Sequence, residues 1–212
     1  MQYRAGIVAA ISALTVVEAA ALASPYFSVR SQLPEGYRVE HMTWTGVVER
    51  GGPEVSINGT IEEVTRQIRA VKKDFTWAGL RRDLGLVDTP LQERGIEADI
   101  KCGIGGEGTD TGPGAPKRQA EEARDMLEEV PGACEVAAGP RACSVVSCAG
   151  DAAIWLCNDN AALIAPACSS LASHASDIIG KCARNVEGID FSRGQKFQPD
   201  NTNVIVGLKL NC

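Results

Sequence analysis

Histidine is scarce in this sequence, and positive charge is nowhere in excess. His41 and His174 are the only histidines, and no Gly-x-Ser-x-Gly motif is present, so a serine triad has little to build on. The formal net charge at pH 7 is −6, and neither half of the chain has the basic stripe of a nucleic-acid binder. An anionic membrane surface would not attract it either. These absences predict a protein that is not an enzyme and does not bind nucleic acid.

Long apolar runs are absent after residue 23, so we expect no stable membrane span. Residues 1–23 carry Arg4 near their start, continue as an apolar stretch, and close on Ala21-Leu22-Ala23, the small-x-small pattern that a signal peptidase reads. A membrane anchor is the competing interpretation, but Glu18 at the bilayer centre would cost roughly 2.5–3.5 kcal/mol. We therefore expect a signal peptide that is cleaved after Ala23, and a secreted, extracellular protein.

Cysteine is absent before residue 102 and frequent after it. No Cys-x-x-Cys pair is present, and zinc sites of the finger or ribbon type need closely spaced ligand pairs, so we expect no metal and no other cofactor. An even number of cysteines in an exported chain predicts a disulfide framework, which leaves no free thiol as a nucleophile. The sequence does not fix how the eight cysteines pair: Cys102, Cys134, Cys143, Cys148, Cys157, Cys168, Cys182 and Cys212.

The cysteine distribution divides the chain into a signal peptide (1–23), a cysteine-free leader (24–100) and a cysteine-rich domain (101–212). In the leader we expect a ββα unit: strands over 42–48 and 54–57, and a helix over 61–75 that Thr60 and Glu63 begin as a capping box. Ile61, Val64, Ile68 and Val71 fall on one face of this helix.

Two interpretations of the leader compete. It is either an accessory subdomain packed on the cysteine-rich domain or a pro-segment removed during secretion. The basic pairs Lys72-Lys73 and Arg81-Arg82 would suit a processing protease, although such pairs are also frequent on solvated helices. The sequence Asn58-Gly59-Thr60 would accept an N-linked glycan in a eukaryotic secretory pathway.

The cysteine-rich domain predicts the order strand, helix, strand, strand, helix, strand. The expected ranges are 97–104, 116–130, 144–148, 152–157, a helix opened by Pro166, and a last strand reaching Cys212. This order predicts an α+β fold, with a small antiparallel or mixed sheet carrying two helices on one face. Trp155 alternates with its neighbours on a strand, and we expect it in the core between helix and sheet.

Three patterns that could indicate a functional site have simpler structural explanations. Residues 103–108 match Gly-x-Gly-x-x-Gly, but the following helix waits for Pro116, so a flexible loop fits better than a dinucleotide site. The acidic side chains of the first helix in this domain lie on its solvated face, where none gains the burial that raises the pKa of an acid catalyst. Residues 158–160 lack the glycine and glutamate of a calcium loop and are interpreted as a turn.

The segment Cys143-Ser-Val-Val-Ser-Cys148-Ala-Gly-Asp-Ala-Ala-Ile-Trp-Leu-Cys157-Asn-Asp-Asn160 resembles a signature of small cysteine-rich secreted proteins of filamentous ascomycete fungi. Cys168, Cys182, a turn at Gly194-Gln195 and the ending 203–207 fit the same pattern. The order of elements is also similar to that of fungal necrosis-inducing effectors and of the killer toxin of smut fungi.

Expected export, the expected disulfides and the lack of a credible catalytic constellation lead us to expect a monomeric, non-enzymatic fungal effector or toxin-like protein that binds a protein or glycan target outside the cell. The resemblance supplies no motif from which a functional residue can be carried over. A small secreted hydrolase with an unrecognised site and a cell-surface structural protein are the alternatives.

Overall fold

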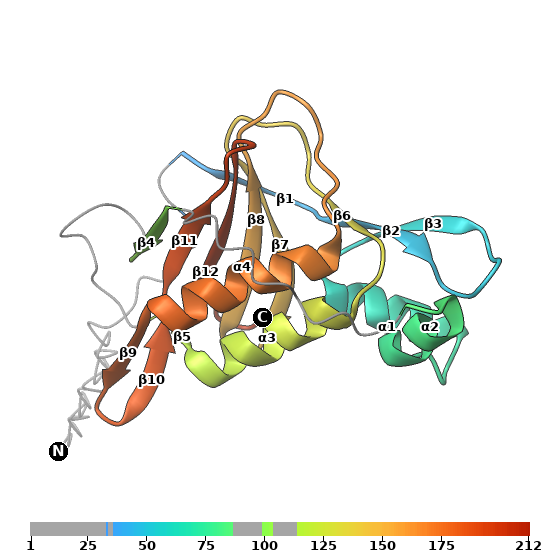
Figure 1. The fold of residues 1–212 in the computed structure, drawn as a ribbon, viewed down its shortest axis with the longest axis horizontal. Coiled ribbons are helices and arrows are strands. Elements are labelled where there is room, and N and C mark those ends of the chain that lie inside the picture. Colours follow the sequence, from blue (N-terminus) through green and yellow to red (C-terminus); the bar gives the residue numbers. More distant parts are fainter. Residues whose placement is uncertain (1–32, 34–35, 87–98, 104–113) are drawn as a thin grey trace, which may run out of the picture.

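The computed structural model describes residue 33 and residues 36–86, 99–103 and 114–212. The expected signal peptide, its cleavage site after Ala23 and the glycine motif beyond Gly103 lie outside these residues. The described chain has the expected α+β fold, built on a mixed six-stranded sheet in the order β1-β7-β8-β12-β11-β4 (Figure 1). Two three-stranded sheets adjoin it, β5-β10-β9 and β3-β2-β6.

The strands are β1 Arg38–Glu40, β2 Thr43–Val47, β3 Glu54–Asn58, β4 Ile100–Cys102, β5 Ala115–Pro116, β6 Ala133–Glu135, β7 Ala142–Ala149, β8 Ala152–Asn158, β9 Ala183–Val186, β10 Ile189–Ser192, β11 Gly194–Phe197 and β12 Thr202–Leu208. The helices are α1 Ile61–Val71, α2 Trp77–Leu84, α3 Lys117–Glu129 and α4 Cys168–Lys181. Strand β1 runs parallel to β7, and the other paired strands are antiparallel.

Helices α3 and α4 lie side by side across one face of the large sheet, as expected (Figure 1). Pro116 precedes the first residue of α3, where a missing backbone N–H is tolerated. The apolar positions of both helices recur every three or four residues, and this spacing places them against the sheet. The buried residues of the two helices, together with Val130 directly after α3, are Ala120, Ala123, Leu127, Val130, Cys168, Leu171, Ala172, Ala175, Ile178 and Ile179.

The opposite face of the sheet is also buried, which differs from our expectation for Trp155. Its side chain is 2 % exposed, but it belongs to a cluster on the side away from the helices, with Cys143, Cys157 and Ile205. The prediction that Trp155 lies between helix and sheet was therefore wrong, although its burial was correct. The alternation of β8 gives its helix side to Ile154 and Leu156 instead.

The ββα unit of the leader is present. Strands β2 and β3 form the hairpin, and Thr60 and Glu63 make the capping box of α1. The helix ends at Val71, whose side chain is 88 % exposed, and so does not continue to Phe75. The chain leaves helical geometry at Lys72 and turns, and Phe75 is buried after that turn. A second short helix, α2, follows and was not expected.

The end of the chain also departs from the sequence-based expectation. Strand β12 stops at Leu208, and Leu210 is 45 % exposed. The last residues fold over the turn between β7 and β8, because Lys209 N donates to the Asp151 carbonyl and Cys212 N donates to the Gly150 carbonyl. Gly194 and Gln195, expected as a turn, begin strand β11.

Four disulfides connect all eight cysteines. They join Cys102 to Cys182, Cys134 to Cys168, Cys143 to Cys157 and Cys148 to Cys212. Two of them attach α4 at its two ends, to β6 and to β4, while a third crosslinks the neighbouring strands β7 and β8. Four disulfides indicate that the protein folds in an oxidising environment.

Candidate functional site

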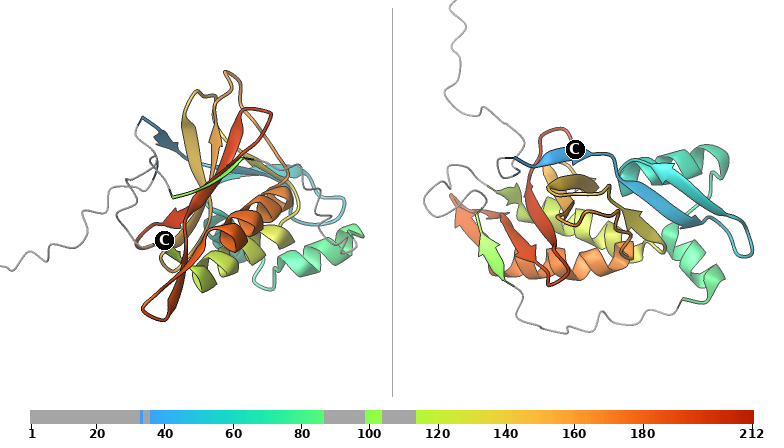
Figure 2. Two further views of the ribbon diagram at one scale, coloured as in Figure 1. Left: turned by 60° about the vertical axis from the view of Figure 1, so that its left-hand side comes forward. Right: turned by 90° about the horizontal axis from the view of Figure 1, so that it is seen from above.

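The strongest candidate for a contact surface is the hairpin of β9 and β10, which projects from the body of the molecule (Figures 1 and 2). All four residues of β9 are exposed, and so are the turn and the first two residues of β10. Val186 and Ile189 face each other across the strands and are 48 % and 56 % exposed. Removing apolar side chains from water is favourable, so this exposed pair marks a surface that a binding partner could cover.

This hairpin has a defined shape. Its two central residues, Glu187 and Gly188, have φ angles of 51° and 85°, the positive values that a tight two-residue turn between twisted strands requires. The Asn185 side chain accepts a hydrogen bond from Gly188 N at 3.1 Å and donates one to Asp190 Oδ1 at 2.8 Å. At its base, β10 also pairs with β5. A stiff hairpin loses little conformational entropy when it binds.

Our sequence interpretation missed this hairpin. The signal that could have found it is Val186-Glu187-Gly188-Ile189, a glycine-containing two-residue turn flanked by β-branched residues. The strands are too short to show a clear alternation, and this is why the pattern went unrecognised.

His174 is one of the two histidines that could serve as the base of a serine triad. It lies near the middle of α4, and burial, followed by the charge of Lys196, lowers its pKa from the ordinary value. Lys196 is almost fully buried and forms an ion pair with Asp177. The Nδ1 atom of His174 is buried and has no hydrogen-bond partner among the described residues.

The serines near His174 use their hydroxyls elsewhere. Ser170 Oγ donates to the Ala167 carbonyl at 2.7 Å, and Ser173 Oγ donates to the Ser170 carbonyl at 2.9 Å. No serine–histidine hydrogen bond is found among the described residues, and the required nucleophile–base contact of a hydrolase is not formed there. His41, the other histidine, is exposed between β1 and β2.

Other chemistries that side-chain clusters can carry are not seen in the described ranges. Residues 33, 36–86, 99–103 and 114–212 contain no group of three or more histidine, cysteine, aspartate or glutamate side chains placed to hold a metal ion. Asn158, the first residue of the suspected calcium loop, is buried and donates to the carbonyls of Ala137 and Ala162 at 2.9 and 2.8 Å. It therefore fixes two loops to β8. Within the same ranges, no helix is both long and apolar enough to cross a bilayer.

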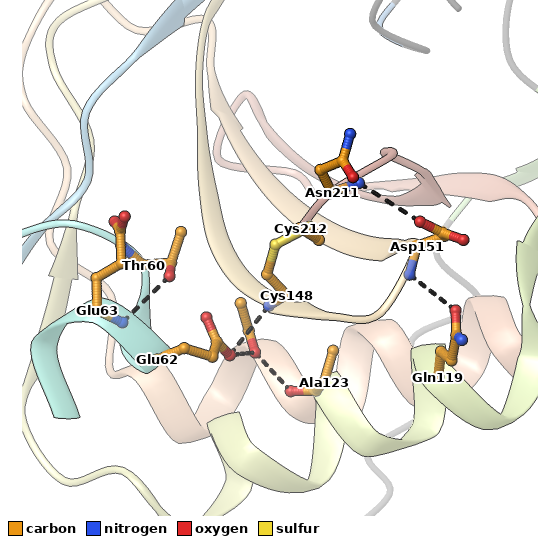
Figure 3. Close-up of a disulfide and its surroundings, with 10 residues drawn as sticks. Thr60, Glu62, Glu63, Gln119, Ala123, Cys148, Asp151, Asn211 and Cys212 are labelled. Atoms are coloured by element: carbon orange, nitrogen blue, oxygen red, sulfur yellow. Dashed lines mark hydrogen bonds between the residues drawn. A yellow bond between two sulfur atoms is a disulfide. The ribbon is translucent and has the colours of Figure 1, made fainter. Parts of the chain in front are cut away.

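A buried polar contact connects the leader to the cysteine-rich domain (Figure 3). Glu62, on α1, accepts a hydrogen bond from Cys148 N at 3.0 Å, and its Oε1 atom lies 2.6 Å from Ser147 Oγ. The same hydroxyl lies 2.8 Å from the Ala123 carbonyl of α3. A β-bulge between Val145 and Ser147 allows the serine to face the helices directly after the buried Val146. Glu62 thus reaches the strand that carries the Cys148–Cys212 disulfide.

An open groove of about 550 Å³ lies between α1 and α3. Its lining includes Glu62, Arg66 and Arg69 of α1 and Met126 of α3. Arg66 is paired with Glu63 at 3.7 Å, and Arg69 Nε donates to the Phe75 carbonyl at 3.0 Å, so both arginines already have partners. His174 is not among the residues that line this groove.

The modification sites suggested by the sequence lie in different settings. Asn58 is exposed at the end of β3, and its Oδ1 accepts a hydrogen bond from Thr43 Oγ1 at 2.8 Å. Arg81 and Arg82 lie within α2.

No protein-family model, curated protein or solved structure matches this chain.

Proposed function

We propose that this protein is secreted and acts outside the producing cell by binding a target, as an effector or toxin-like protein of the kind fungi export. The observation that carries the proposal is the stiff, projecting hairpin with its exposed pair Val186 and Ile189. The four disulfides and the apolar, Ala-Leu-Ala-terminated beginning of the chain support export. The resemblance of residues 143–160 to small secreted fungal proteins supports the same class.

A protein target fits this surface better than a glycan. Sugar rings are commonly bound by stacking on exposed aromatic side chains, and all three tryptophans of this chain are buried, at 0, 5 and 2 % exposed for Trp44, Trp77 and Trp155. The apolar side chains exposed on the hairpin are instead aliphatic, and covering aliphatic area stabilises protein–protein contacts. The same hairpin also carries the exposed charged residues Arg184, Glu187 and Asp190, so charges of both signs accompany this apolar pair.

The proposal is tested by applying the purified, oxidised protein to leaf tissue and to competing microbes, and by comparing it with two variants. The double variant Val186→Ser, Ile189→Ser removes the apolar pair. The control is Leu163→Ser, because Leu163 and Ile189 are both 56 % exposed but lie in different places. We expect the biological response to be lost in the double variant and kept in the control, with unchanged far-UV circular dichroism in both.

Two outcomes would contradict the proposal. One is an undiminished response of the double variant, which would place the contact elsewhere. The other is the absence of any response together with hydrolysis of a polysaccharide or ester substrate, which would favour a secreted hydrolase.

A further inference from the structure

We infer that residues 36–86 are a permanent part of the folded protein and that Arg81-Arg82 is not a maturation site. The first support is a shared hydrophobic core. Eight buried side chains of this segment belong to the same cluster as the buried faces of α3, α4 and the large sheet: Met42, Trp44, Ile61, Val64, Ile68, Phe75, Trp77 and Leu80.

The contact between the two parts continues through the backbone. Strand β2 pairs with β6, with Trp44 opposite Cys134, and β1 pairs with β7. The fully buried Trp44 donates from Nε1 to the Pro131 carbonyl at 2.9 Å. Gly132 has a φ of 96°, and a Cβ there would lie 2.5 Å from the Thr45 carbonyl, so the chain after α3 passes directly against β2. Contact this close does not fit a segment that is later released.

A polar contact also joins the leader to the cysteine-rich domain. Glu62 accepts a hydrogen bond from the Cys148 N–H (Figure 3). It also lies within hydrogen-bond distance of the Ser147 hydroxyl. Without the segment, the N–H and the hydroxyl would lose this acceptor. The Ser147 hydroxyl would keep the Ala123 carbonyl as a partner, so the bond that is lost is the one from the Cys148 N–H. This hydrogen bond joins the leader to the cysteine-rich domain in addition to the apolar packing.

The basic pair itself is held in a conformation that proteases do not accept. Processing proteases bind their substrates in an extended conformation, whereas Arg81 and Arg82 lie inside α2, which the buried Trp77 and Leu80 anchor to the core. The carbonyls of Arg81 and Arg82 accept hydrogen bonds from Leu86 N and Gly85 N, the capping pattern at the end of the helix. Cleavage after Arg82 would require α2 to unfold first.

No covalent bond other than the backbone would retain the segment after cleavage, but its removal would expose apolar surface. No cysteine precedes Cys102, so no disulfide retains the leader. Its departure would expose the apolar surfaces of β6, β7 and α3 that it now covers. The segment is therefore held by non-covalent contacts alone: the shared core, the strand pairing and the hydrogen bonds. Contacts of this extent make it part of the mature fold.

The first test exposes the full oxidised chain to a protease that cuts after paired basic residues, with the reduced and alkylated chain as the unfolded reference. Cleavage after Arg82 should be roughly 1,000-fold slower in the oxidised protein. The reason is that, at equilibrium, only a fraction on the order of 10⁻³ or less of the molecules of a folded protein is unfolded. Rapid cleavage of the oxidised protein after Arg82, with release of the N-terminal fragment, would overturn the inference. So would a secreted form whose intact mass places its N-terminus at Asp83 or later.

The second test asks whether the segment unfolds with the rest of the chain. Trp155→Phe leaves Trp44 and Trp77 as the only tryptophans, both in the segment. In urea, tryptophan fluorescence and far-UV circular dichroism should change at the same midpoint in this variant. An earlier fluorescence transition would show an independent subdomain and contradict the inference. The wild-type chain, in which Trp155 also contributes to the fluorescence, is the reference.

Discussion

At the residue scale, Glu62 is the side chain whose role is most local and most testable. It satisfies the Cys148 N–H and contacts the Ser147 hydroxyl from a different part of the chain. We expect Glu62→Ala to lower the free energy of unfolding by roughly 1–3 kcal/mol, since the Cys148 N–H would lose its acceptor. The control is Glu128→Ala on the exposed face of α3, which should change it by less than about 0.5 kcal/mol. Urea unfolding of the oxidised variants measures both, and equal effects would contradict the role of Glu62.

Asn58 and Thr60 are two further residues whose roles can be separated. Thr60 is both the third residue of the glycosylation sequence and the N-cap of α1. In a eukaryotic expression host we predict a glycan on the exposed Asn58, removed by Asn58→Gln, Thr60→Ala and Thr60→Asp alike. Only Thr60→Ala also loses the cap, at a cost of about 0.5–2 kcal/mol, because aspartate caps as well as threonine. Mass spectrometry reads the glycan and urea unfolding reads the cap; wild-type protein without a glycan would refute the first prediction.

At the element scale, the β9–β10 hairpin depends on two turn residues with positive φ, Glu187 and Gly188. Gly188→Ala places a side chain at a φ of 85°, and we expect faster hydrogen exchange of the hairpin amides and a loss of roughly 1–3 kcal/mol in local stability. Gly180→Ala is the matched control, since Gly180 lies in α4 with open space around it. That change should stabilise the protein by roughly 0.5–1 kcal/mol. The same sign in both variants would contradict the strained turn.

At the scale of the whole molecule, the disulfides differ in access. Both cysteines of Cys143–Cys157 and of Cys134–Cys168 are fully buried, whereas Cys102 and Cys212 are exposed. Mild reduction should therefore open Cys102–Cys182 and Cys148–Cys212 first. These bonds also close the longest loops, over 80 and 64 residues, so opening them should remove roughly 2–4 kcal/mol each. Alkylation with mass mapping at increasing reductant concentrations tests the order; early loss of Cys143–Cys157 would contradict it.

The sequence by itself was enough to predict most of the helices and strands that have one apolar face. The spacing in α3 and α4 and the capping box of α1 were readable because helix periodicity and cap chemistry are local. The existence of a disulfide framework could also be predicted, because an even number of cysteines in a chain expected to be exported is typical of one. Helices α3 and α4 on one face of a sheet followed from the order of elements.

Only the tertiary structure decided what depends on distant partners. Strand β8 is apolar on both faces, so the alternation alone could not say that Trp155 points away from the helices. The last strand ends early because the final residues form hydrogen bonds with the turn between β7 and β8. The pairing of cysteines, the contact of Glu62 with β7 and the shared core of the leader join residues far apart in the sequence, and only the packed chain brings those partners together.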